Sequence, residues 1–469
     1  MIQENTYTSE PNAADKNKCN GKHNSWRYKE EEMEENMSKD KGSIDIDYLL
    51  ENVIGDGGRG QWLIFLVQFP ILIVSVIPWL TQMFSAYEPR HRCYIPTCDD
   101  SMNTTKNTIH NSFLEFALPK DYKSSEIFKE DENFDPCKMY KKIDNSQPSC
   151  DADSFDNSSI TKCTEFVYDD SEFIETLTTK FDLVCDEEYK RRFLGTLMML
   201  GLLFGSFIGG WLGDKFGRKI TLLVSHIILA PIVTFGGLSP NYETYAALRL
   251  ISATCLPAMW ISGHCLTLEI FGKEYRKSVV MVKDFVFPSG QLILVGIIYA
   301  TRHWTYIHIW SGVACMLSFP CYFFLPESPR WLATNGKRKQ AERVLLNIAK
   351  LNGKVLSEDQ LNLITDTLML LEKDAKKTEE TRSISMLDMI SSNHRTKTLL
   401  LLFSWITIVL GEYTLMLNAT KLYGSVLINY TLVVTVSDFP GAMILLVTLK
   451  YFGRRLNLFY TQFILGKIF

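Results

Sequence analysis

Long apolar segments alternate with strongly polar segments along the chain of 469 residues. The first apolar run, residues 61–84, contains no charged side chain, and about 20 apolar residues are enough to cross a bilayer as a helix. Similar runs recur along the chain. We therefore predict an all-α membrane protein with eight spanning helices and the start of a ninth, over residues 61–84, 193–212, 220–238, 245–269, 279–300, 305–325, 398–417, 426–449 and from about 456.

Three polar stretches separate groups of these helices. Residues 1–42 lack the apolar core of a signal peptide, and Ser43 followed by acids is typical of a helix start, so we expect a short surface helix before the first span. Residues 327–397 contain two predicted amphipathic helices. The predicted organisation is a cytosolic tail (1–60), a first span (61–84), an extracellular loop (85–192), spans two to six (193–326), a cytosolic linker (327–397), and spans seven, eight and a partial ninth (398–469).

The short loops indicate the orientation, because short cytosolic loops are enriched in Lys and Arg. With the N-terminus in the cytosol, the loops at 213–219, 270–278 and 450–455 hold nine basic residues, and the short outer loops hold two. Three basic residues at 190–192 fall on the outer side, but long loops are translocated largely regardless of their charge. We predict a multi-pass protein of the plasma membrane with a cytosolic N-terminus.

The loop at 85–192 has the composition of an extracellular segment. Its 23 acidic residues exceed its 13 basic residues over 85–191, which either concentrates cations near the outer side or only keeps the loop soluble. Asn103 and Asn157 begin glycosylation sequons. We also expect that copies of the chain associate through this loop. An even number of cysteines predicts three disulfides, with fifteen pairings open, among Cys93, Cys98, Cys137, Cys150, Cys163 and Cys185.

Composition and motifs exclude several classes of protein. The 46% hydrophobic and 22% charged residues would suit an average soluble protein, but the two kinds are segregated along the chain. The 12% aromatic content argues against a disordered chain. The sequence lacks the phosphate-binding pattern G-x4-G-K-[ST], and no catalytic constellation or metal-ligand spacing stands out. We therefore expect no enzyme, no ATP-driven pump, no nucleic-acid partner and no cofactor or metal.

Motifs at the predicted inner side indicate a gate. Glycines at 201, 205, 209 and 213 form a stripe on the second span, which suits either tight packing or sliding. That helix ends in the pattern G-x3-D-[RK]-x-G-R-[RK], span four ends in E-x6-R, and span six ends in Pro-Glu-Ser-Pro-Arg. Their charges predict an ion-pair cluster that closes the cytosolic side, and the gate residues are Gly210, Asp214, Lys215, Gly217, Arg218, Lys219, Glu269, Arg276, Glu327 and Arg330.

The chain resembles the organic cation, carnitine and organic anion transporters of the major facilitator superfamily. The motifs that carry the resemblance are GDGGRGQW (55–62), EPRHRC (88–93), FDLVCDEEYKRR (181–192), GDKFGRK (213–219), PESPRWL (326–332) and DFPGA (438–442). DFPGA looks more like the cation branch. One departure is Lys450, which stands where the second copy of the signature loop would have an acid. The resemblance implies two six-helix halves that rock about a site near the bilayer midplane.

Polar and aromatic residues inside the spans are candidates for substrate binding, because charges there are costly and usually face a cavity. Acids and an aromatic ring can each attract an organic cation, and by resemblance Trp260, Asp284 and Glu412 line the central cavity. Three candidates have a structural alternative: Trp260 packs, Asp284 pairs with Lys283 or with a basic group on another span, and Asp438 caps or orients the kink at Pro440. The candidates are Trp260, Asp284, Glu412, Asp438, Gln291 and Tyr413.

These observations leave three functions open. The leading hypothesis is transport of organic cations or carnitine-like zwitterions by alternating access. The second is organic anion transport or exchange. Twelve spans of about 20 residues plus the three polar stretches need well over 469 residues, so we expect the chain to stop inside span nine. The third hypothesis is therefore a truncated, non-transporting membrane protein that acts through its extracellular loop or beside a full-length carrier.

Overall fold

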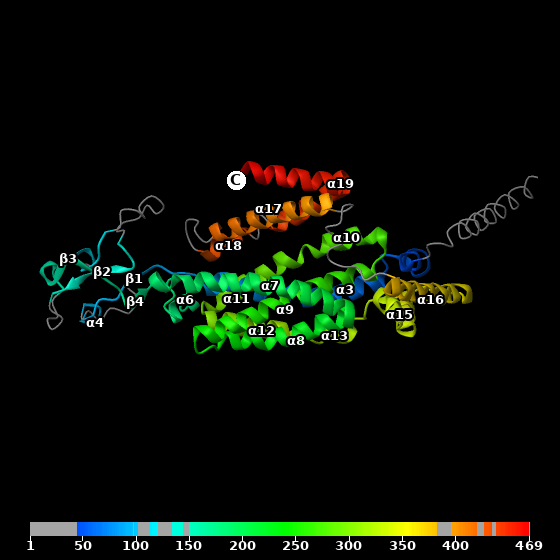
Figure 1. Ribbon diagram of the computed structural model, residues 1–469, viewed down its shortest axis with the longest axis horizontal. Helices are drawn as coiled ribbons and strands as arrows, with labels where there is room; N and C mark the ends of the chain where they lie inside the picture. The colour runs from blue at the N-terminus through cyan, green and yellow to red at the C-terminus, as the bar shows by residue number, and fades with distance from the viewer. Residues whose placement is uncertain are drawn as a thin grey trace, which may run out of the picture.

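The computed structural model describes residues 45–96, 98–101, 113–120, 134–143, 150–381, 395–419, 426–433 and 438–468. Asn103 lies outside the described residues, as does most of the tail at 1–60. Long helices run along the length of the molecule, with short strands at one end and helices α15 (Arg338–Leu351) and α16 (Glu358–Thr381) at the other (Figure 1). We call these the strand end and the linker end. The predicted helical membrane fold is confirmed.

Among the described residues, six helical segments are long and apolar enough to cross a membrane. The fifth of these combines two helices across a turn at Asp284 and Phe285. The helices are α3 (Arg59–Ser85), α7 (Glu188–Phe216), α8 (Arg218–Gly237), α9 (Tyr242–Ile270), α10 (Lys273–Lys283) with α11 (Val286–Thr301), and α12 (Trp304–Leu317) with α13 (Cys321–Phe324).

Helix α7 begins before the predicted second span, and the basic residues at its start explain why. Arg191 and Arg192 each pair with Glu188 at 2.9 Å, so this polar turn is stabilised as helix. Farther along α7 the glycine stripe packs on α9. A Cβ atom at Gly205 would lie 2.2 Å from the carbonyl oxygen of Thr254, so only glycine permits this approach. The stripe therefore serves close packing in this structure.

Three further helices form a separate layer beside α10 (Figure 1): α17 (Arg395–Ala419), α18 (Val426–Val433) and α19 (Phe439–Ile468). The predicted eighth span, 426–449, is divided between α18 and the start of α19. Helix α19 also contains the predicted start of the ninth span, because it consists of two helices that meet at a kink, where Gly453 has φ 71°. The second layer contacts the first through α10 and α11.

The cysteine-rich loop contains short strands that the sequence pattern did not predict. Strand β1 (His91–Cys93) pairs antiparallel with β4 (Phe166–Tyr168), and β2 (Lys138–Lys142) pairs antiparallel with β3 (Phe155–Lys162). The described part of the loop also contains the short helices α4 (Cys98–Ser101), α5 (Leu114–Ala117) and α6 (Leu177–Lys180) and two 3-10 turns, Ala152–Ser154 and Cys185–Glu187. All six loop cysteines form disulfides, in the pairs Cys93–Cys163, Cys98–Cys150 and Cys137–Cys185.

The segment before the first span is helical, as predicted, but it is buried rather than on the surface. It comprises α2 (Ile46–Tyr48) and a π-helical stretch, Leu49–Gly55. Leu49, Leu50 and Ile54 are fully buried in one core with residues of α15, α16 and α14 (Pro329–Thr334). Apolar burial of about 25 cal/mol per Å² therefore holds this segment against the linker helices.

Candidate functional site

The signature loop between α7 and α8 turns at Gly217, which has φ 110°. A Cβ atom there would lie 2.3 Å from the carboxylate of Glu327, so glycine is needed both for its backbone angle and for this contact. The Glu327 carboxylate accepts hydrogen bonds from the backbone N–H groups of Arg218 and Lys219, each at 3.0 Å. Glu327 therefore caps the positive end of α8.

Arg218 connects the ends of three helices at the same place. Its guanidinium pairs with Asp214 at 3.0 Å and Glu269 at 3.3 Å, and it donates to the carbonyl oxygen of Gly213 at 2.6 Å. Trp331 donates to the carbonyl oxygen of Asp214 at 2.7 Å. The predicted gate residues Asp214, Arg218, Glu269 and Glu327 are thus brought together, and we call them the Arg218 cluster.

The other two predicted gate arginines belong to a different group, centred on Asp47. The carboxylate of Asp47 lies 2.5 Å from Arg276 and 3.4 Å from Arg330, and Arg330 also pairs with Asp45 at 2.7 Å. We call these four residues the Asp47 cluster. Sequence reasoning missed both acids as gate partners, although it placed them at a helix start, because their partners are more than 200 positions away.

The gate residues therefore form two clusters instead of the single ion-pair cluster that we expected. Glu327, just before α14, belongs to one cluster and Arg330 of α14 to the other, so this segment joins the two. Of the remaining gate residues, Lys215 lies over the ring of Trp211 at 4.6 Å. A side chain at Gly210 would meet nothing within 4 Å. Among the described residues, both clusters connect only the first six spans, the N-terminal segment and the linker.

A group of aromatic rings lies among α3, α9 and the fifth span. The ring centroid of Trp79 is 5.1 Å from that of Trp260 and 5.2 Å from that of Phe287. Trp260 donates to the hydroxyl of Ser75 at 2.9 Å. All three rings keep part of their surface exposed. We call Trp79, Trp260 and Phe287 the aromatic trio, and only Trp260 was predicted from the sequence.

Gln291 joins the two layers of helices. This buried side chain of α11 donates to the hydroxyl of Tyr430 on α18 at 3.2 Å, and the carboxylate of Asp438 lies close to the same amide group. The rings of Phe285 and Phe439 also meet between the layers, tilted by 42° with centroids 6.3 Å apart. Gln291 and Asp438, two predicted candidates, therefore meet at the seam between the layers.

The structure describes the surroundings of Lys283 and Asp284, but not those of the last two candidates. Lys283 lies 2.8 Å from Nδ1 of His264, and Asp284 at the next position also acts on it electrostatically, so the alternative of a Lys283–Asp284 pair stays a prediction. Glu412 and Tyr413 lie on α17, and their side chains lie outside the described residues.

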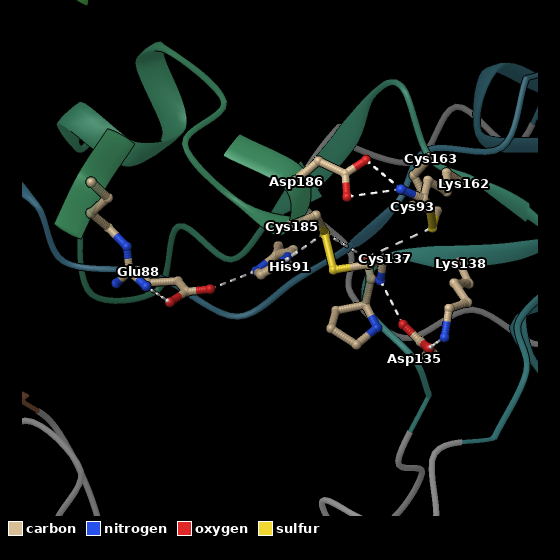
Figure 2. Close-up of a disulfide and its surroundings, with 12 residues drawn as sticks. Glu88, His91, Cys93, Asp135, Cys137, Lys138, Lys162, Cys163, Cys185 and Asp186 are labelled. Atoms are coloured by element: carbon tan, nitrogen blue, oxygen red, sulfur yellow. Dashed lines mark hydrogen bonds and ion pairs between the residues drawn. A yellow bond between two sulfur atoms is a disulfide. The ribbon is translucent and has the colours of Figure 1, made fainter. Parts of the chain in front are cut away.

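The disulfide Cys137–Cys185 lies beside His91 at the strand end (Figure 2). His91 approaches Glu88 at 3.9 Å, and burial lowers the pKa of the imidazole below its ordinary value. One nitrogen and two sulfur atoms lie within 4.8 Å of one another here. Because the two sulfurs are joined, they offer no thiolate to a metal. The arrangement is therefore a partly buried disulfide rather than a metal centre.

Comparison with known proteins adds to this geometry. A family model described as "Sugar (and other) transporter" matches residues 171–466. Solute carrier family 22 member 1 of Bos taurus is 29% identical over 281 residues, which are 60% of this chain and 48% of that protein. The beta-alanine transporter of Drosophila melanogaster is 26% identical over 446 residues, which are 90% of this chain and 71% of that protein.

A third relative is the organic cation transporter protein of Drosophila melanogaster, which is 26% identical over 88% of this chain and 72% of its own length. The chain thus spans about half the length of the bovine relative and under three quarters of the two insect relatives. The inferred resemblance to organic cation transporters is confirmed. Among solved structures, the xylose transporter XylE from E. coli aligns with a TM-score of 0.45 and 17% identity, over 60% of this chain and 68% of XylE.

Proposed function

Because the chain belongs to the sugar (and other) transporter family, we propose that it carries small organic cations across the plasma membrane by alternating access. In such carriers two helical halves rock about a substrate site near the bilayer midplane. The layer of α17, α18 and α19 would belong to the second half, and the first six spans would form the first half. The substrate would then bind at the seam between them.

The observation that carries this proposal is the polar contact at the seam. Asp438, beside the start of α19, meets Gln291 of the first half, and the side chain of Gln291 also holds Tyr430. A carboxylate inside a span is costly unless it has a partner, and an ammonium ion is a suitable one. Together with the aromatic trio, whose faces attract cations, these groups support a site for an organic cation.

The two clusters at the linker end support the alternating-access part of the proposal. Asp214 is 79% exposed, and exposed ion pairs contribute only about 0–1 kcal/mol each. Such pairs can order the inner ends of α7, α8 and α9 without preventing movement. Lys277 also donates to the carbonyl oxygen of Leu449 in α19 at 2.6 Å, which is a contact between the halves that opening would break.

The experiment is uptake of labelled tetraethylammonium by cells that express the chain, compared with mock cells. We expect saturable uptake that falls when the cells are depolarised, because the potential contributes about 2.3 kcal/mol per 100 mV to entry of one charge. Glu412→Gln and Asp284→Asn should each lower uptake about tenfold, the equivalent of 1.4 kcal/mol of lost attraction.

Surface biotinylation provides the control, since each variant must reach the surface in wild-type amounts. Uptake equal to that of mock cells at normal surface expression would favour the non-transporting alternative. Uptake of labelled organic anions, with indifference to both substitutions, would favour the anion alternative.

A further inference from the structure

We propose that residues 45–57 form a latch on α10, which is the inner half of the fifth span. The latch holds α10 against α19, and its release lets α10 move about the break at Asp284 and Phe285 and open the cytosolic side. This inference rests on the proposed function, because it assigns a moving part to the same transport cycle. It is carried by the contacts at the two ends of α10 and by its contact with α19. We call residues 45–57 the N-terminal latch.

The first turn of α10 obtains its cap from a distant part of the chain. The N–H groups of a first helical turn need acceptors, and Gly272 at the N-cap position has no side chain to supply one. The carboxylate of Asp56 accepts instead from the N–H of Gly272 at 2.8 Å and from that of Tyr275 at 3.3 Å. Glu51 accepts from the N–H of Lys273 at 2.9 Å. Two acids of the latch therefore cap the positive end of α10.

The latch also fits the side chains of this turn closely. Gly57 has φ 65°, and a Cβ atom there would lie 2.4 Å from the ring of Tyr275. Glycine is therefore needed both for the backbone angle and for the ring. A third acid of the latch, Asp47, pairs with Arg276 in the same part of α10. The start of α10 is thus held by polar contacts and by shape.

The other side of the latch is fixed to the linker and to α3. Asn352, just after α15, donates to the carbonyl oxygens of Ile54 and Gly55, each at 3.1 Å. Its own side-chain oxygen accepts from the N–H of Gly60 at the start of α3 at 2.7 Å. Because the latch also shares a buried core with α14, α15 and α16, it is a fixed support from which α10 is held.

The far end of α10 is the break in the fifth span, and Pro288 explains it. Proline has no N–H, so Pro288 cannot donate to the carbonyl oxygen of Asp284, four residues before it. The N–H of Phe285 bonds to the carbonyl oxygen of Val282, only three residues back, at 3.2 Å. Tightened turns of this kind inside a helix often mark hinges. The span therefore consists of two helices joined where the backbone ladder is interrupted.

Between its two ends, α10 touches the second layer of helices. Lys277 donates to the carbonyl oxygen of Leu449 in α19 at 2.6 Å, and α10 lies on the side of the first layer that faces α19 (Figure 1). Lys277 follows the capped turn directly, so its position depends on the latch. A helix that is held at one end, hinged at the other and in contact with the opposite half can act as a gate.

The first test is amide hydrogen exchange of the purified full chain, followed by mass spectrometry of peptides from α10, α11 and α8. We expect Asp56→Ala to speed exchange in α10 about tenfold, because loss of the cap favours local opening of the helix. Exchange in α8 and α11 should stay at the wild-type rate. Asp56→Asn keeps one acceptor oxygen and should give a smaller increase in α10.

The matched control is Glu274→Gln, which removes an exposed carboxylate from the same turn of α10 and should leave the exchange rate near that of the wild type. Because Asp56→Ala can unfold the chain, Asn352→Ala is a second variant that releases the latch from the linker side, and it should also speed exchange in α10. Unchanged exchange of α10 in Asp56→Ala would overturn the inference. So would a rise in α8 equal to that in α10 in all three latch variants.

The second test asks whether the latch must open during transport by the full chain in proteoliposomes. Glu51→Cys with Lys273→Cys places two thiols where the latch meets α10, and a short bis-maleimide joins them. We expect the joined double variant to take up labelled tetraethylammonium at no more than about one tenth of its untreated rate, as for a blocked gating step. Each single variant, treated in the same way, should be unaffected. Undiminished uptake by the joined double variant would overturn the latch.

The wild-type chain separates failure of this inference from failure of the proposed function. Uptake by the wild type, with exchange of α10 unchanged in Asp56→Ala, would overturn the latch and leave the proposed function standing. A wild-type chain that takes up no tetraethylammonium would overturn the proposed function, whatever the exchange of α10 shows.

Discussion

Replacing Asp47 with alanine is expected to lower the free energy of unfolding by about 3 kcal/mol, which is the cost of removing one partner from a buried ion pair. The Asp47 side chain is only 3% exposed. Its carboxylate faces Arg276 at 2.5 Å, Arg330 at 3.4 Å and Lys273 at 3.8 Å. Without it, three cations would face one another around an emptied position.

The effect of Asp47→Ala is measured as the melting temperature of the purified chain in detergent, followed by tryptophan fluorescence. For a chain of 469 residues, a loss of about 3 kcal/mol corresponds to a fall of about 3 °C. Asp45→Ala is the matched control, because Asp45 is 40% exposed and its one ion pair among the described residues is with Arg330. Its carboxylate also accepts from the backbone N–H of Ile46 at 2.7 Å as the N-cap of α2, so its loss should cost about 1 kcal/mol. Equal shifts in the two variants would contradict the buried role of Asp47.

The second large effect concerns the disulfide Cys137–Cys185. It joins positions 48 residues apart, and closing a loop of that length stabilises a protein by about 4 kcal/mol in the chain-entropy model. Cys185 begins the 3-10 turn Cys185–Glu187 that leads directly into α7, so the bond fastens the start of β2 to a membrane-spanning helix. The double substitution Cys137→Ser, Cys185→Ser should therefore free the cysteine-rich loop from the bundle.

We expect this double variant to reach the cell surface at no more than about one tenth of the wild-type amount, because losses of 1–2 kcal/mol already change abundance several-fold. Surface biotinylation measures the amount. Cys321→Ser is the control, since Cys321 in α13 forms no disulfide, and it should remain near wild type. Normal surface expression of the double variant would show that this bond does not hold the loop in place.

The spanning helices could be predicted from the sequence because hydropathy alone determines them. Their ends were less accurate: α7 begins at Glu188, since the charged turn there is stabilised by pairs with Glu188 itself. The break at Asp284 and Phe285 and the short strands of the loop were not predicted. The loop strands depend on disulfides and on pairing between distant segments, which a local pattern does not reveal.

Part of the candidate site could be predicted from the sequence, and the contacts between helices could not. Trp260, Gln291 and Asp438 were identifiable because polar or aromatic groups in a span are unusual. Trp79 and Tyr430 became visible only through contacts with Trp260 and Gln291 across helices. The sequence left open a pairing of Lys283 with Asp284, whereas the contact of Lys283 with Nδ1 of His264 at 2.8 Å joins two helices, which a pattern along the chain does not reveal.

The site between the halves is tested most directly by titrating the purified full chain with labelled tetraethylammonium. We expect saturable binding by the wild type and a Kd raised at least about tenfold by Trp260→Ala and by Asp438→Asn. Lys339→Met, which removes an exposed lysine of α15, should leave the Kd unchanged. If the wild-type chain binds no tetraethylammonium, or if both substitutions leave the Kd as it is, the organic cation site proposed at the seam does not exist.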